Sequence, residues 1–147
     1  MAANRKVLFA SDFSPASRPA FAKALELTLA LKAQLLIVHT VAPVVPAEAL
    51  YAPIGDWDAL ARTIQQATQA ELDRLAAQAR RRGLRVQTVI ANGYAAEEIL
   101  RVARARRVYA IVMGTHGRTG VSRLLVGSVA TRVMMAAPCP VMTVRRK

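Results

Sequence analysis

Ala110–Arg132 reads AIVMGTHGRTGVSRLLVGSVATR, and this stretch decides the fold of the chain. The apolar run Tyr109–Met113, which begins one residue before this stretch, has the length and the branched residues of a strand that is buried on both faces. Gly114 and Gly117 follow at the end of this strand. Glycine lets the main chain take positive φ and lets a ligand approach the backbone closely. We therefore expect the chain to bind a ligand where this strand ends.

A helix start closes the same stretch. Gly127 leads into Ser128, and serine is a favoured N-cap in front of main-chain N–H groups that have no partner inside the helix. The start of a helix is for that reason a natural site for an anion. A strand, a glycine loop and a helix N-terminus, in this order, predict a phosphate-binding site.

Strand-like and helix-like patterns alternate along the rest of the chain. This alternation predicts an α/β fold: a Rossmann-like, doubly wound parallel sheet of five strands with helices on both faces, in a single domain over residues 1–147. The third strand alternates at its start, which favours an edge position. The strands are predicted at 6–10, 34–40, 84–91, 109–113 and 140–144, and the helices at 15–33, 56–83, 94–107 and 129–137.

Two of these helices carry more detailed predictions. In the helix at 94–107, Glu97 and Arg101 are spaced to form an i,i+4 ion pair, and the arginines at its end complement the helix dipole. The helix that begins at Asp56 has an apolar stripe that we expect to be buried, made of Leu60, Ile64, Ala67, Leu72, Leu75 and Ala79.

Ligands of doubly wound sheets bind beyond the carboxyl ends of the strands, where the winding direction switches. If the first and fourth strands are neighbours there, Asp12 and Gly114 face each other across one crevice, but the sequence alone does not fix this order. The long connection 41–55 contains three prolines and leaves the carboxyl end of the second strand. It is either a lid over a site or a variable surface loop, and we favour the lid.

The chain is strongly basic, with 21 Lys and Arg residues against 9 acidic ones and a formal net charge of +12. This charge indicates either an anionic partner, such as nucleic acid, a membrane surface or a phosphorylated ligand, or arginines spread over solvated helix faces. We favour the second interpretation, because the basic residues are scattered along the sequence without interleaved aromatic residues. We therefore do not expect nucleic acid as a partner.

Compartment is indicated by three features. No apolar run approaches the roughly 18 residues that a membrane span needs, and the first residues lead directly into a strand without a signal peptide. The single cysteine, Cys139, excludes an internal disulfide and suits a reducing setting. We expect a cytoplasmic protein without a membrane partner.

Several polar residues have both a functional and a structural interpretation. Asp12 either contacts a ligand or satisfies the amides of its own turn, and Arg118 either pairs with phosphate or points to water. His116 either acts as a general acid or base or contributes its main-chain N–H to the loop, and we favour the main-chain N–H. We interpret His39 as a hydrogen-bonded core histidine and Cys139 as a small buried residue. No metal-ligand spacing and no catalytic residue is identified.

The glycine loop lacks the spacing of a Walker A motif and of the dinucleotide fingerprint. It does match G-x2-G-x9-G-S, from Gly114 to Ser128, and with this motif the chain resembles the universal stress proteins, in their ATP-binding branch. The resemblance covers nearly the whole chain. It also includes VLFASDFS at residues 7–14, LIVH at 36–39, GYAAEEI at 93–99 and PCPV at 138–141.

This resemblance implies a strand order of 3-2-1-4-5 and a nucleotide site. Ala10, Ser11 and Asp12 would border the nucleoside, and Thr40 would offer main-chain groups to the adenine. The residues that would wrap the ribose and phosphates are Met113, Gly114, Thr115, His116, Gly117, Arg118 and Thr119. The residues that would hold the phosphate tail are Gly127, Ser128, Val129 and Ala130. Ala10 and Thr40 depart from the proline and valine common in relatives, which affects base selectivity more than phosphate binding.

The resemblance further implies a homodimer formed through the last strand, Val141–Val144. The leading hypothesis for function is an ATP-binding sensor or regulator in the stress response, with any Mg²⁺ arriving together with the phosphates. The alternatives are a slow ATPase or nucleotidyl-transfer enzyme in which Asp12 holds Mg²⁺, and an electrostatic nucleic-acid binder.

Overall fold

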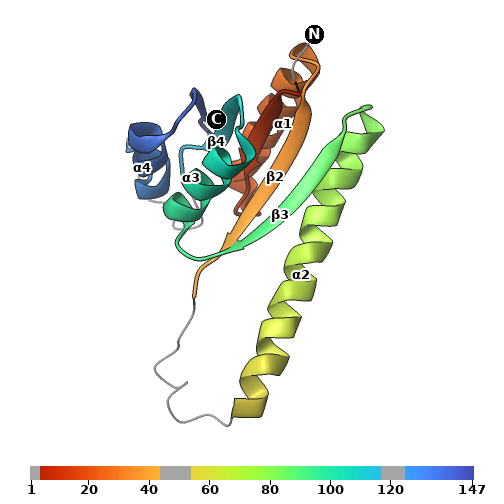
Figure 1. Ribbon diagram of the computed structural model, residues 1–147, viewed down its shortest axis with the longest axis vertical. Helices are drawn as coiled ribbons and strands as arrows, with labels where there is room; N and C mark the ends of the chain where they lie inside the picture. The colour runs from red at the N-terminus through yellow and green to blue at the C-terminus, as the bar shows by residue number, and fades with distance from the viewer. Residues whose placement is uncertain (1–3, 44–53, 117–124) are drawn as a thin grey trace.

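The computed structural model describes residues 4–43, 54–116 and 125–147. Within them a five-stranded parallel sheet has the order β3-β2-β1-β4-β5, as predicted, with β3 at one edge. The loop prediction for 41–55 lies largely outside the described residues. The elements are β1 (Lys6–Ala10), η1 (Pro15–Ser17), α1 (Arg18–Ala30), β2 (Gln34–Val41), α2 (Ile54–Arg81), β3 (Val86–Asn92), α3 (Ala95–Arg106), β4 (Ala110–Gly114), α4 (Ser128–Ala136) and β5 (Val141–Val144) (Figure 1).

The central strands are buried on both faces, because alternate residues of each strand point to opposite sides of the sheet. In β1, Val7 and Phe9 pack with α1 and α2, whereas Leu8 packs with α3 and α4. The Phe9 and Phe21 rings lie 5.2 Å apart between centroids, which fixes α1 on its face. The two helical layers therefore follow directly from the near-continuous apolar runs of β1, β2 and β4.

Helix α2 is buried only in its second half, which corrects the predicted stripe. Leu72 and Ala79 are fully buried, but Leu60 and Ile64 are 46% and 38% exposed and Ala67 is exposed as well. The reason is length: 28 residues of helix at about 1.5 Å each outrun the strands they cover. Figure 1 shows α2 continuing well past the end of the sheet. No helix in the described part of the chain is both long and apolar enough to span a bilayer.

The predicted ion pair between Glu97 and Arg101 is also wrong. Arg101 instead pairs with Glu98, at 2.7 Å and with i,i+3 spacing, and this contact raises the pKa of Arg101 above its usual range. Glu97 lies 3.8 Å from Arg132 of α4. Glu98 is drawn inward because it packs over Gly93, where a Cβ would meet its Cγ at 2.8 Å.

Helix α4 begins one residue earlier than the serine cap predicts. Gly127 is the N-cap, with φ −60° and ψ 157°, and Ser128 is the first helical residue. The carbonyl oxygen of Gly127 accepts the Thr131 N–H at 3.0 Å and the Thr131 hydroxyl at 3.0 Å. Gly127 does not have a positive φ, but a Cβ at this position would lie only 3.0 Å from the carbonyl oxygen of Thr115.

Candidate functional site

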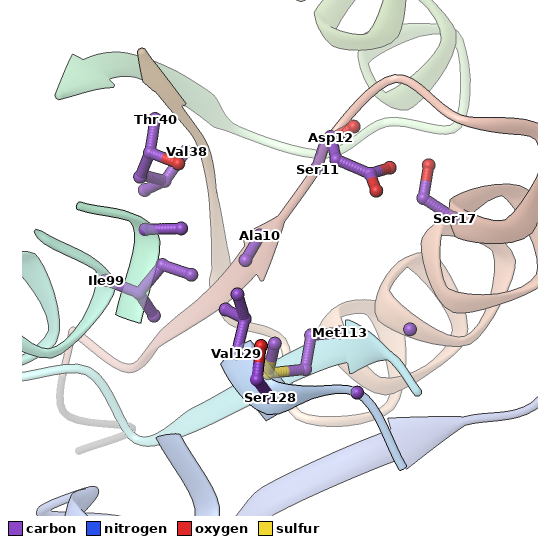
Figure 2. A pocket seen from close by; sticks show the side chains of 13 residues that line it. Ala10, Ser11, Asp12, Ser17, Val38, Thr40, Ile99, Met113, Ser128 and Val129 are labelled. Atoms are coloured by element: carbon purple, nitrogen blue, oxygen red, sulfur yellow. The ribbon is translucent and has the colours of Figure 1, made fainter. Parts of the chain in front are cut away.

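A cavity of about 150 Å³ opens at the carboxyl ends of β1, β2 and β4. The starts of α3 and α4 complete its wall, so five separate segments of the chain meet there. Figure 2 shows the side chains around this space. Its lining residues are Ala10, Ser11, Asp12, Ser17, Val38, Thr40, Ala95, Ile99, Met113, Gly114, Gly127, Ser128 and Val129.

Most of the residues singled out in the sequence lie on this cavity. Nine of them line it: Ala10, Ser11, Asp12, Thr40, Met113, Gly114, Gly127, Ser128 and Val129. Thr115, His116 and Ala130 do not line it. Gly117, Arg118 and Thr119 lie outside the described residues.

Three residues next to the cavity have other roles in the described structure. Thr115 is 3% exposed, and its N–H bonds to the carbonyl of Val144 at 3.1 Å. The side chain of Ala130 is packed in the core with α3. The Thr115 hydroxyl lies 2.9 Å from Nδ1 of His116.

Four lining residues were not predicted from the sequence: Ser17, Val38, Ala95 and Ile99. Val38 of β2 pairs with Ala10 of β1, which was a predicted site residue, so strand pairing alone brings Val38 to the cavity. Ala95 and Ile99 belong to the 93–99 segment of the family resemblance, which indicated the family but no role. Ser17 carried no signal, because it is recruited by the turn of η1.

The cavity has an apolar side and a polar side. Ala10, Val38, Ile99, Met113 and Val129 form the apolar side, whereas Ser11, Asp12 and Ser17 lie together on another side in Figure 2. An apolar slot with a few convergent polar groups is typical of small-molecule sites. The arrangement can hold a flat apolar ring and fix its orientation by hydrogen bonds.

Helix α4 presents its N-terminus to the cavity. The first hydrogen bond of its ladder joins the Thr131 N–H to the Gly127 carbonyl. Helix geometry leaves the N–H groups of the first residues, Ser128 to Ala130, without partners inside the helix, and the dipole is positive at this end. This is the geometry of an anion site, and Gly127, Ser128 and Val129 bring it to the cavity wall.

His39 holds the loop that follows β1. Its Nδ1 donates a hydrogen bond of 2.8 Å to the carbonyl oxygen of Ser11, and its ring stacks on Phe13 at 4.1 Å between centroids. Phe13 has the left-handed φ of 61°, which is costly for an aromatic residue. Its N–H is satisfied by the hydroxyl of Ser11 at 3.1 Å. The prediction of a hydrogen-bonded core histidine is confirmed, and this core contact supports the cavity wall.

Asp12 stabilises its own turn, as one of its two interpretations predicts, and the residue lies on the cavity wall. Its Oδ1 accepts the Ser14 N–H at 2.9 Å. Among the described residues no group of three His, Cys, Asp or Glu could hold a metal ion. A magnesium ion bound with a nucleotide usually takes one or two carboxylates and the phosphate oxygens, so Asp12 alone fits such an ion.

A sequence profile of the universal stress protein family matches residues 3–145. The universal stress protein MJ0531 of Methanocaldococcus jannaschii is 32% identical over 146 residues, covering 97% of this chain and 82% of that protein.

Solved structures agree with the fold. The hypothetical protein MJ0577 of Methanocaldococcus jannaschii superposes with a TM-score of 0.78, at 25% identity and with 98% of this chain and 97% of that chain covered. A universal stress protein solved in complex with cAMP superposes with a TM-score of 0.72, at 19% identity and with 98% of each chain covered. The universal stress protein from Archaeoglobus fulgidus in complex with dAMP gives 0.67 at 19% identity, covering 99% of this chain and 100% of that one.

Proposed function

Because this chain belongs to the universal stress protein family, we propose that its cavity binds an adenine nucleotide, ATP, and that the protein acts as a nucleotide-dependent sensor or regulator in the stress response. The observation that carries this proposal is the meeting of the β1 end, the β4 end and the α4 N-terminus at one cavity. Two similar folds were solved with cAMP and with dAMP, which supports an adenine nucleotide as the ligand class.

The two sides of the cavity suit the two ends of such a ligand. The apolar side formed by Val38, Ile99 and Met113 would take the base, and Ser11 and Asp12 would face the sugar. The main-chain N–H groups at the start of α4 would take the phosphates, because main-chain donors and the helix dipole both favour negative charge there. Of the residues outside the described part, Gly117, Arg118 and Thr119 belong to the proposed phosphate side.

The cavity supplies binding groups but few reactive ones. Asp12 is the carboxylate that lines it, and that carboxylate is already engaged by the Ser14 N–H. Mg²⁺ bound with the phosphates would screen their charge, with Asp12 as its protein ligand. We expect at most slow hydrolysis of bound ATP and a role in signalling, not a dedicated catalyst.

Calorimetric titration with ATP, AMP, cAMP and GTP tests the proposal. We expect a micromolar Kd for ATP, which corresponds to about −8 kcal/mol, and weaker binding of GTP. Mass spectrometry of small molecules released from freshly purified protein would identify the nucleotide independently. If no adenine nucleotide binds and none is released, the proposal is wrong.

We also propose that two copies pair through β5. This strand is an edge of the sheet, and Met142 on it is 41% exposed. An edge strand with an apolar, uncharged sequence is a natural site for strand pairing. In sedimentation equilibrium the wild type should be a dimer, whereas Thr143→Pro should be a monomer because proline blocks the main-chain pairing. A wild-type monomer at micromolar concentration would contradict the pairing.

A further inference from the structure

The fold gathers basic residues at the end of the sheet opposite the cavity. The strands are parallel, so the segments that lead into β1, β2, β3 and β4 all lie at the amino ends of the strands. In Figure 1 the turns from α1 into β2 and from α2 into β3 both lie toward the upper end. These segments contain no acidic residue, and we call their ten cations the basic end: Arg5, Lys6, Lys32, Arg80, Arg81, Arg82, Arg85, Arg104, Arg106 and Arg107.

Main-chain hydrogen bonds show that these segments are neighbours. The Leu35 N–H bonds to the carbonyl of Arg85 at 2.9 Å, and the Gln34 N–H bonds to the carbonyl of Arg5 at 2.8 Å. The Tyr109 N–H bonds to the carbonyl of Lys6 at 2.8 Å. The basic end therefore runs across four adjacent strands, which are spaced by about 4.8 Å. Lys6 is half-buried, and the other nine cations are exposed.

Helix dipoles account for only a part of this charge. The C-termini of the four α-helices lie at the same end, and each carries about half a negative charge. Together the four helix ends supply a charge of about −2, whereas the ten cations supply +10. Some cations are engaged: Lys6 donates to the carbonyl of Arg106 at 3.2 Å, and Arg104 to that of Ala136 at 3.0 Å. Much of the positive charge is left facing solvent.

Two of these cations have the left-handed backbone conformation that favours glycine. Lys32 and Arg107 follow α1 and α3 with φ of 49° and 50°. At the corresponding place after α2 the chain has Gly83, with φ 80°. A residue with a Cβ in this conformation costs about 1 kcal/mol, which the dipole of the helix C-terminus offsets in part. The chain thus keeps charge at two turns where backbone preference favours glycine.

We infer that the basic end binds the phosphate backbone of a nucleic acid. Eight of its ten cations are arginine, whose planar guanidinium matches phosphate oxygens two at a time. The exposed Tyr109 lies among them, with the Arg5 guanidinium 5.0 Å above its ring, and this pair offers a flat surface to a base. These cations and Tyr109 are far apart in the sequence but lie close together on the folded surface. The scattered positions in the sequence are therefore no argument against a nucleic-acid surface.

The test compares two triple variants with equal loss of charge. Arg82, Arg85 and Arg107 are changed to Gln at the basic end, and Arg18, Arg62 and Arg132 are changed to Gln elsewhere as the matched control. Binding of a fluorescent single-stranded RNA of about 20 nucleotides is followed by anisotropy at several salt concentrations. We expect the basic-end variant to bind the RNA about tenfold more weakly than wild type. The slope of the logarithm of the binding constant against the logarithm of the salt concentration should be smaller in magnitude by about 2. The control should stay within about twofold to threefold of wild type.

ATP titration of the same variants separates this inference from the proposed function. Both triple variants should keep wild-type ATP affinity, since none of their residues lines the cavity. An equal loss of RNA affinity in the two variants would overturn the inference, because net charge alone would then explain binding. So would tighter binding to phosphatidylserine vesicles than to RNA at about 150 mM salt, which would make the basic end a membrane surface.

Arg107→Gly provides a second, independent measurement. Glycine accepts the left-handed φ, so thermal stability should be unchanged or higher, while RNA affinity falls several-fold because a cation is lost. A variant that keeps both its stability and its RNA affinity would contradict the role of this turn.

Discussion

The main-chain N–H of Gly127 donates a hydrogen bond of 2.6 Å to the carbonyl oxygen of Thr115. Twelve positions separate these residues in the sequence, yet this contact ties the end of β4 to the start of α4. A Cβ on Gly127 would lie 3.0 Å from the same oxygen. The bond therefore sets how the α4 N-terminus approaches the cavity, and a side chain at position 127 would press against the Thr115 carbonyl.

Replacing Gly127 by valine should abolish most ATP binding. The β-branched side chain would meet the Thr115 carbonyl and push the start of α4 away, which misplaces the proposed phosphate donors. We expect affinity to fall by at least about a hundredfold, close to 2.7 kcal/mol. Isothermal titration of the variant, with circular dichroism to confirm folding, measures this.

Ser128→Ala is the matched control for that variant. Ser128 is exposed at the first turn, so the change removes a hydroxyl and leaves the main-chain N–H groups in place. Affinity should fall by less than about fivefold, or about 1 kcal/mol. A larger loss from Ser128→Ala than from Gly127→Val would mean that the side chain, not the main chain, holds the phosphate.

His39 should affect nucleotide binding without touching the nucleotide. His39→Phe keeps a ring to stack on Phe13 but removes the donor to the Ser11 carbonyl, whereas His39→Asn keeps a donor and removes the ring. If the hydrogen bond positions Ser11 and Asp12, ATP affinity should fall in the phenylalanine variant and recover in the asparagine variant. Nitrogen shifts of the His39 ring, assigned with a His116→Gln variant, should report a protonated Nδ1. Equal affinities in both variants would leave His39 a core residue only.

The two halves of α2 should respond differently to the same truncation. Leu72 is fully buried and Leu60 is 46% exposed. Leu72→Ala should cost about 2–5 kcal/mol of unfolding free energy, because it leaves a cavity between α2 and the sheet. Leu60→Ala should cost less than about 1 kcal/mol. Urea denaturation of both variants measures the difference, and similar costs would mean that the first half of α2 is covered in solution.

Cys139 is only partly buried, and its thiol should ionise at a higher pH in the folded protein than in the unfolded chain. Burial raises the pKa of its thiol above the ordinary value, so the folded state holds the proton more tightly than the unfolded state does. This contribution to stability is complete below the unfolded pKa and is lost as pH rises through the folded pKa. The pH of half-maximal alkylation by iodoacetamide should therefore be higher for folded protein than for urea-unfolded protein. A lower value in the folded state would contradict this.

Local pattern predicted most elements to within three residues, because strands buried on both faces leave long apolar runs and the helices carry recognisable starts and stops. Prediction from local pattern failed where burial or pairing depended on residues far away in the sequence or on the side chains packed nearby. The exposed half of α2 has the same periodicity as the buried half, and only the reach of the sheet separates them. Glu98 displaces Glu97 as the partner of Arg101 because Gly93 leaves room beneath it.

The sequence by itself determined the alternation of strands and helices and the glycine motif from Gly114 to Ser128, since these depend on local spacing. Strand order brought the β1, β2 and β4 ends to one cavity, and that depends on non-local pairing. Parallel pairing also carried Arg5, Lys32, Arg85 and Arg107 to the opposite end. Residues far apart along the chain become one surface only when the sheet forms, so tertiary structure alone decided where cavity and charge lie.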